Sequence, residues 1–294
     1  MKAEVRDGIV AVAGATGRQG GAVARALIAD GWKVRALTRQ PHSEEALALA
    51  ELGAEAVACE LGNRASISVA LQGASALFLT TTPYESGVEE EEKQAKLAIE
   101  VSRDIGIHQI VYSSVASADQ PTGVAHFESK GRVEQFLADV GAPVVTVLRP
   151  TFFMDMFLGN AFRRGLERRS IEFLIKPETR IAMIAVQDIG AFAAHTFAHP
   201  VDLAGQVIDL AGDYPSMIEL AAAMSKALDT AIEYHQVDEG ELAEDIRPKP
   251  GTQRWLEEVG WQVDPAGLAR YHVPLTDVST WARRHREALL PVGA

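Results

Sequence analysis

The sequence has little cysteine, an excess of acidic over basic residues and no long apolar run, and each shortage excludes a class of protein. Its 294 residues include one cysteine, Cys59, which cannot form a disulfide within the chain. Lysine and arginine number 28 against 40 aspartate and glutamate residues, which gives a formal net charge of −12. Because nucleic acids are bound largely through cations that neutralise phosphates, we expect no nucleic-acid contact.

The sequence also lacks the signals of a membrane, secreted or metal-binding protein. No apolar run approaches the roughly 20 residues of a membrane-spanning helix. The first residues, MKAEVRDG, carry mixed charges instead of a basic start followed by an apolar stretch. His195 and His199 are four residues apart but lack the glutamate of the H-E-x-x-H zinc motif. We therefore expect a cytoplasmic protein with no membrane contact and no bound metal.

The chain does contain a regular alternation of short apolar runs with segments of helix length. Apolar residues make up 47% of the sequence, enough for a large core without crosslinks. The predicted strands are Ile9–Ala13, Lys33–Leu37, Ala56–Cys59, Ala76–Thr80, Gln109–Ser113 and Val144–Leu148. Strands that alternate with helices form βαβ units, whose right-handed crossovers produce a parallel sheet covered on both faces. The predicted fold class is therefore α/β, with a doubly wound parallel sheet of the Rossmann type.

After Pro150 this alternation breaks, which predicts a second part of the chain. Residues 1–150 are expected to form the Rossmann domain, and residues 181–212 are expected to return to it with two strands and a helix. Residues 151–180 and 213–294 are expected to form a smaller C-terminal α/β lobe, with helices over Ser216–Leu228 and Glu239–Ile246. Such lobes commonly supply a substrate pocket.

A glycine-rich turn directly follows the first predicted strand. Residues 14–21 read Gly-Ala-Thr-Gly-Arg-Gln-Gly-Gly, with the spacing G-x-x-G-x-x-G. Between a first strand and a first helix, such a turn lets the backbone approach a pyrophosphate, which the N–H groups and positive dipole end of the helix bind. The predicted cofactor-binding residues here are Gly14, Ala15, Thr16, Gly17, Arg18, Gln19 and Gly20. The alternative is a glycine turn that serves close packing only.

The end of the second predicted strand lacks the acidic residue that would bind the ribose 2′-hydroxyl of NAD. Residues 37–41 read Leu-Thr-Arg-Gln-Pro. The guanidinium of Arg39 is a fixed fork of donors suited to a 2′-phosphate, with Arg18 as a candidate second clamp. We therefore expect the cofactor to be NADP(H). The alternative is that Arg39 is a solvated residue at the strand end.

These and later motifs resemble the NmrA-like family of atypical short-chain dehydrogenase/reductases, which includes the HSCARG-type NADPH sensor proteins. The shared stretches are Gly14–Gly21, Arg39, Thr80–Glu85, Val111–Ser114, His126–Glu134, Leu148–Asp155 and Val186–Gly190. The resemblance covers most of residues 8–235 and fades in the C-terminal part. It implies an NADP-binding Rossmann domain with a small C-terminal lobe.

The resemblance also implies cofactor contacts outside the glycine turn. These are Glu60 and Leu61 near the adenine, Thr81 and Thr82 near the ribose and pyrophosphate, Lys130 at the nicotinamide ribose, and Pro150, Phe152 and Phe153 beside the nicotinamide ring.

The catalytic tyrosine of the wider superfamily is replaced in this chain. Short-chain dehydrogenases carry that tyrosine four residues before the ribose-binding lysine, on the same helix face, where the ammonium lowers the pKa of the phenol that moves the proton. The residue four positions before Lys130 is His126. Ser113 stands at a strand end, where the superfamily has the serine that polarises the substrate carbonyl. The candidate catalytic residues are therefore His126, Lys130 and Ser113.

Two functions of different classes follow from this replacement. Imidazole titrates near neutral pH, so His126 could donate the proton in an NADPH-dependent reductase. A quinone could take its proton from water, so a small conjugated acceptor of this kind is the expected substrate. If instead the site has lost its acid, the protein would bind NADPH as a redox sensor and act through a protein partner, with His126 as a structural residue.

One further charged segment is expected to have no part in the site. The acidic run Glu89–Glu92 suits the first turn of a helix, where carboxylates interact favourably with the helix dipole. We expect it to form a solvated helix face.

Overall fold

The computed structural model describes residues 8–141, 144–242 and 246–290. The chain divides into two compact units. The first comprises Met1–Pro121, Ala125–Arg149 and Ile189–Asp209, and the second comprises Thr122–Val124, Pro150–Asp188 and Leu210–Ala294. Among the described residues, no helix is long and apolar enough to cross a membrane.

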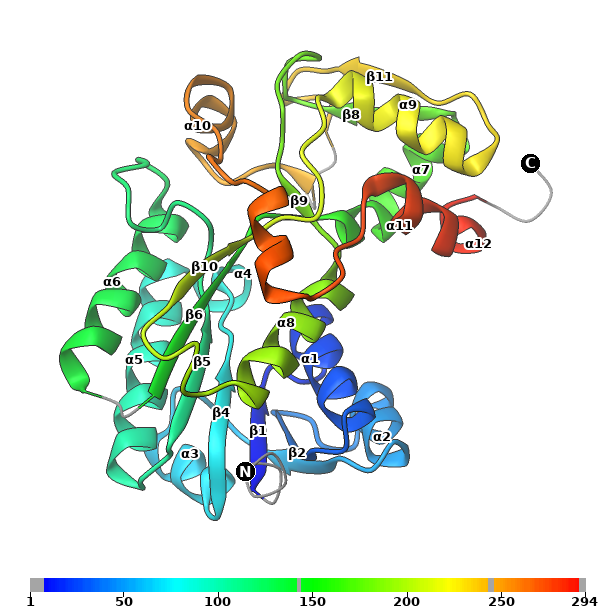
Figure 1. Cartoon of the computed structure of the whole chain (residues 1–294). Helices are drawn as coiled ribbons and strands as arrows, with labels where there is room; N and C mark the ends of the chain where they lie inside the picture. Colours follow the sequence, from blue (N-terminus) through cyan, green and yellow to red (C-terminus); the bar gives the residue numbers. More distant parts are fainter. Residues whose placement is uncertain (1–7, 142–143, 243–245, 291–294) are drawn as a thin grey trace. The chain divides into compact units, whose positions relative to one another are not determined.

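A seven-stranded sheet forms the framework of the first unit (Figure 1). Its strands are β1 (Ile9–Ala13), β2 (Lys33–Thr38), β3 (Glu55–Ala58), β4 (Ala74–Leu79), β5 (Gln109–Ser113), β6 (Val144–Pro150) and β10 (Val207–Leu210). They lie in the order β10-β6-β5-β4-β1-β2-β3, and all pairings from β3 to β6 are parallel. The predicted doubly wound parallel sheet is confirmed, and the six predicted strands agree with the observed ones to within two residues at each end.

Helices cover both faces of this sheet (Figure 1). One face is covered by α3 (Arg64–Leu71), α5 (Val88–Asp104) and α6 (Ala125–Val140). The other face is covered by α1 (Arg18–Ala29) and α8 (Val186–Ala198), with α2 (Glu44–Glu51) beside α1. On that face Trp32, just before β2, meets Phe197 of α8 edge to face, with ring centroids 6.4 Å apart.

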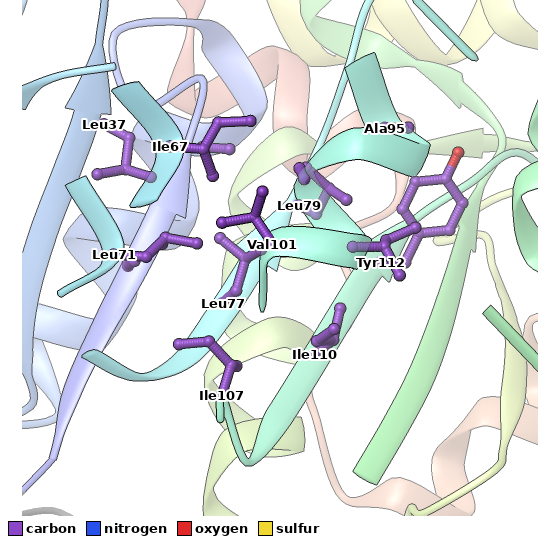
Figure 2. Close-up of a cluster of buried hydrophobic side chains, with 14 of the residues drawn as sticks. Leu37, Ile67, Leu71, Leu77, Leu79, Ala95, Val101, Ile107, Ile110 and Tyr112 are labelled. Atoms are coloured by element: carbon purple, nitrogen blue, oxygen red, sulfur yellow. The ribbon is translucent and has the colours of Figure 1, made fainter. Parts of the chain in front are cut away.

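Alternation along the strands distributes the apolar side chains between the two faces. Leu77 and Leu79 of β4 lie in one cluster with Ile67 of α3 and Val101 of α5 (Figure 2). Phe78 lies between the two leucines, so its side chain points to the opposite face of the sheet. It is 0% exposed, because helices cover that face as well. Burial on both sides is what makes parallel strands almost continuously apolar, and it explains why these segments could be recognised in the sequence.

The second unit combines small sheets with short helices. β8 (Ser170–Phe173) pairs with β11 (Glu233–Gln236), and β7 (Phe152–Phe153) pairs with β9 (Met183–Ile184), both in parallel. Its helices are α7 (Asn160–Glu167), α9 (Met217–Leu228), α10 (Thr252–Glu258), α11 (Val278–Arg284) and α12 (Arg286–Leu289), with 3-10 helices at Met154–Leu158 and Ala266–Tyr271. This unit has the mixed α/β character expected of the smaller lobe.

One helix predicted in this unit is confirmed and another is not. α9 begins after Ser216, whose side chain forms a capping box with Glu219. The helix predicted over Glu239–Ile246 is wrong for residues 239–242, which form a turn, while residues 243–245 lie outside the described residues. In that turn the backbone N–H of Asp238 donates to the Glu241 carboxylate at 2.9 Å, a bond of the same kind as the one in the capping box of α9, but the turn does not continue as an α-helix within the described residues.

We predict that Leu77→Ala lowers the free energy of unfolding by about 2–5 kcal/mol, because it leaves a cavity in the packed sheet. Leu77 is 1% exposed, whereas Val69 on α3 is 70% exposed. Val69→Ala is therefore the control and should change the free energy by less than about 0.5 kcal/mol. Urea denaturation followed by circular dichroism measures both variants, and equal effects would contradict this assignment of the core.

Candidate functional site

The carboxyl ends of the parallel strands meet at one edge of the sheet in the first unit. β1 lies between β2 and β4. The chain therefore extends the sheet from β1 through β2 and β3 in one direction and then from β4 onward in the other. In doubly wound sheets, ligands bind at the carboxyl edge beside this reversal. The turns that follow β1 to β5 all lead to this edge, and they carry most of the residues that the sequence pointed to.

The turn after β1 requires glycine at two positions. Gly14 has a φ of +64°, in the left-handed region that side chains disfavour. A Cβ on Gly20 would lie 2.2 Å from the Gly14 carbonyl oxygen, so close packing alone accounts for that glycine. A Cβ on Gly17 would meet only the Gly14 oxygen, at 3.2 Å, and Gly17 has an ordinary extended backbone. Backbone conformation therefore explains Gly14 and packing explains Gly20, but neither explains Gly17.

The helix that follows the turn presents an N-terminus suited to an anion. α1 begins at Arg18 with Gly17 as the N-cap residue, and no side chain caps it. The first N–H groups of any helix have no intrahelical partners and form the positive end of its dipole. Because Gly17 and Arg18 are exposed, this N-terminus is accessible to a pyrophosphate.

Gln19 connects this helix to two neighbouring strand ends. Its side-chain amide donates a hydrogen bond to Ser113 Oγ, and its carbonyl oxygen accepts one from Thr80 Oγ1 at 3.2 Å. The structure thus brings a predicted cofactor-binding residue into contact with a predicted catalytic one. Ser113 is 1% exposed, and because it accepts from Gln19, its own O–H is a separate donor.

Lys130 is buried and forms an ion pair. Its Nζ lies 2.8 Å from Glu91 Oε1 and donates to the Thr81 carbonyl oxygen at 3.0 Å. Thr81 Oγ1 donates to the same Glu91 oxygen at 3.3 Å. The side chains of Lys130 and Glu91 are 10% and 2% exposed. Lys130 therefore joins α6 to α5 and to the end of β4, and it fixes the position of Thr81.

The expectation that Glu89–Glu92 is a solvated face is wrong for Glu91. Glu91 shares the buried stripe of α5 with Ala95 and Ala98, which follow it at helical spacing. A carboxylate on that stripe requires a buried cation as its partner, because an unpaired buried charge is strongly destabilising. The apolar periodicity of α5 was therefore the available signal for this missed residue.

Tyr112 lies close to the Lys130 ammonium, but it does not take the place of the missing tyrosine. The ammonium lies over the face of the Tyr112 ring, 5.6 Å from its centroid. Burial, and then the charge of Glu91, raise the pKa of the Tyr112 phenol well above its usual value. A proton-transferring tyrosine needs the opposite shift.

His126 lies in the first turn of α6 and is half-buried. Its ring packs edge to face against Phe127, with centroids 4.7 Å apart. Lys130 lies four residues further along the same helix, so both residues share one face of α6. Because the Lys130 ammonium is already paired with Glu91, its charge is largely compensated before it can act on a neighbouring acid.

The end of β2 carries Arg39 beside the glycine turn. Thr16 Oγ1 lies 3.2 Å from Thr38 Oγ1, which connects the turn to this strand end. The Arg39 guanidinium holds the carboxylate of Glu85 through both of its terminal nitrogens, each at 2.8 Å. Glu85 belongs to α4 (Pro83–Ser86), after β4. An acidic side chain from the segment after β4 therefore lies at the end of β2.

The remaining predicted cofactor residues fall in three places. Glu60 and Leu61 form the turn after β3, where the Glu60 N–H donates to Ser66 Oγ at 3.0 Å. Thr82 caps α4 by accepting from the Tyr84 N–H. The other three, Pro150, Phe152 and Phe153, belong to the second unit, at the end of β6 and in β7. Their place beside a nicotinamide ring stays a prediction.

Comparison with known proteins assigns the chain to a family. The sequence profile of the NmrA-like family matches residues 6–263. The chain belongs to the NmrA-like family. This confirms the resemblance that the glycine turn and the later motifs indicated.

Two relatives and one solved structure illustrate the similarity of this NmrA-like protein to others. The NmrA-like family domain-containing oxidoreductase malD of Malbranchea aurantiaca is 32% identical over 203 residues, which are 61% of this chain but only 60% of that relative. Quinone oxidoreductase 2 of Escherichia coli is 30% identical over 241 residues, which are 80% of each protein. The triphenylmethane reductase of Citrobacter sp., solved with NADP(H), has a TM-score of 0.80 at 18% identity, over 95% of this chain and 99% of that one. At that identity the structural match shows the fold alone.

We predict that Lys130→Met lowers the free energy of unfolding by about 3–5 kcal/mol, because it leaves Glu91 buried without its cation. The double variant Lys130→Met/Glu91→Leu should recover most of this loss, since it removes both charges. Lys93→Met is the control, with a side chain that is 71% exposed. Urea denaturation measures all three. A double variant as unstable as the single one would show that the ion pair is not the cause.

Proposed function

We propose that this NmrA-like protein is an NADP(H)-dependent oxidoreductase that reduces a small conjugated acceptor such as a quinone. The observation that carries the proposal is made at the carboxyl edge of the sheet. The glycine turn and the uncapped N-terminus of α1 follow β1 there, and Arg39 follows the adjacent strand β2. The name of the E. coli relative, a quinone oxidoreductase, and the NADP(H) bound to the Citrobacter reductase support it.

The residues at this edge fit a dinucleotide. The N-terminus of α1 would hold the pyrophosphate, since Gly17 leaves the backbone open there. Arg39 would bind the 2′-phosphate, and the turn at Glu60 and Leu61 would border the adenine. Thr82 and Lys130 would lie along the riboses.

A bound NADPH would supply the hydride. The chain itself would position the acceptor and provide a proton. Ser113 has an O–H donor beyond its bond to Gln19, which would polarise the oxygen of the acceptor. His126, on the same helix face as Lys130, would donate the proton. Lys130, held by Glu91, would act mainly by keeping Thr81 in place.

A second candidate function is a non-catalytic regulator that senses NADPH and acts through a protein partner. Two observations favour it. The residue in the tyrosine position is His126, and Lys130, whose ammonium would activate a tyrosine at that position, is already paired with Glu91. Steady-state consumption of NADPH with a panel of quinones, run beside NADPH binding by fluorescence, separates the two functions. Tight binding without turnover of any acceptor would favour the regulator.

We predict that Arg39→Ala weakens NADPH binding by about ten- to a hundredfold and changes NADH binding by less than about threefold, because a charge-assisted hydrogen bond contributes about 1.5–3 kcal/mol. Arg64→Ala is the matched control, since Arg64 is also exposed and paired with carboxylates. Isothermal titration calorimetry measures the affinities. If the wild type bound both cofactors equally, Arg39 would not be a 2′-phosphate ligand.

The role of His126 can be separated from that of the cofactor. If it donates the proton, His126→Ala should slow reduction of simple ketones and dye-like carbonyls by about 10²- to 10⁴-fold without a large change in NADPH affinity. If water protonates a quinone product, the same variant should keep its quinone reductase rate. Initial rates with both acceptor classes decide between these outcomes. A large loss of NADPH affinity in His126→Ala would instead point to a structural role.

A further inference from the structure

The ion pair between Arg39 and Glu85 occupies the donors that a 2′-phosphate would use. Both terminal nitrogens of Arg39 lie 2.8 Å from the two oxygens of Glu85, so the carboxylate binds the guanidinium fork as a bidentate partner. A phosphate binds arginine with the same fork geometry. One such fork cannot serve both anions at once in this geometry.

The position of Glu85 results from the loop after β4. Thr82 caps α4 and Pro83 opens it, which places Glu85 in the first turn of this short helix. β4 is separated from β2 by β1, so the loops after β4 and β2 lie on either side of the glycine turn. Glu85 reaches across that turn to a residue 46 positions away in the sequence.

From this geometry we infer that Glu85 is a specificity-determining residue, which competes with the cofactor's 2′-phosphate for Arg39 and so reduces the preference for NADP(H) over NAD(H). The inference rests on the proposed binding of NADP(H). NAD(H) has no 2′-phosphate, so Arg39 and Glu85 stay paired when it binds. NADP(H) must first displace the Glu85 carboxylate from the guanidinium of Arg39.

The size of the effect follows from the exposure of the pair. The side chains of Arg39 and Glu85 are 65% and 54% exposed, so solvent screens their attraction. Ion pairs of this kind change an equilibrium constant by about 1.5- to 5-fold. The 2′-phosphate carries nearly two negative charges and the carboxylate one, so the phosphate displaces Glu85 from Arg39. The displacement weakens NADP(H) binding by this factor of about 1.5- to 5-fold.

The test compares the wild type with Glu85→Gln, which keeps the shape of the side chain and removes its charge. We expect NADPH to bind Glu85→Gln about 1.5- to 5-fold more tightly and NADH to bind with unchanged affinity. Fluorescence titration of both cofactors and calorimetry with 2′-AMP and 5′-AMP provide the affinities, with 2′-AMP expected to follow NADPH. Glu51→Gln, an exposed change of equal charge on α2, is the control and should alter neither affinity.

A double-mutant cycle shows whether Glu85 acts through Arg39. In the Arg39→Ala background, Glu85→Gln should have no effect on NADPH affinity. An equal gain in both backgrounds, or a gain in Glu51→Gln, would overturn the inference in favour of general charge repulsion. Unchanged or weaker NADPH binding by Glu85→Gln would also overturn it, and Glu85→Ala provides a second variant for this comparison.

The same measurements separate this inference from the proposed function. A wild type that binds NADPH but reduces no acceptor would disprove the oxidoreductase and leave the role of Glu85 standing. A wild type that binds neither NADPH nor 2′-AMP would overturn both. NADPH binding that is the same with and without the Glu85 charge would overturn only the inference.

Discussion

Parallel pairing of the strands is the constraint on which the rest of the first unit depends. Each parallel connection needs a crossover, and the crossover helices bury both faces of the sheet. For the same reason the strands from β1 to β6 all end at the same edge, so turns from distant parts of the sequence become neighbours there. The glycine turn, Arg39, Thr81 and Ser113 lie at one edge because six successive strands run in one direction.

Charge compensation is the second physical theme of this edge. Lys130 and Glu91 are both buried, so neither could be tolerated there without the other. Lys130 stands at the position of a catalytic residue, but its ion pair and hydrogen bond connect α6 to α5 and to the end of β4. The ammonium of Lys130 is therefore already compensated, and this makes the presence of His126 four residues before it consistent with either proposed function.

A different balance holds at the exposed ion pair of Arg39 and Glu85. The chain has a net charge of −12, and any anionic cofactor must approach an acidic protein. Arg39 offers a local cation, but Glu85 moderates it at the surface, where screening keeps the interaction weak. Under the proposed binding of NADP(H), a weak competing pair would adjust the preference between two cofactors without abolishing the binding of either, whereas a buried pair such as Lys130–Glu91 acts on the stability of the fold.

The sequence by itself determined the features that depend on neighbours along the chain. The apolar runs of the strands, the glycine turn, the identity of Arg39 and the loss of the tyrosine at His126 are all local, and periodicity or spacing reveals them. The tertiary structure alone decided the partners, because sheet order and helix packing place residues together that no local pattern connects. Gln19 meets Ser113 across 94 positions, and Arg39 meets Glu85 across 46. A charged residue shows its type in the sequence, but its partner and its burial, and hence the energy of their interaction, are set by the fold.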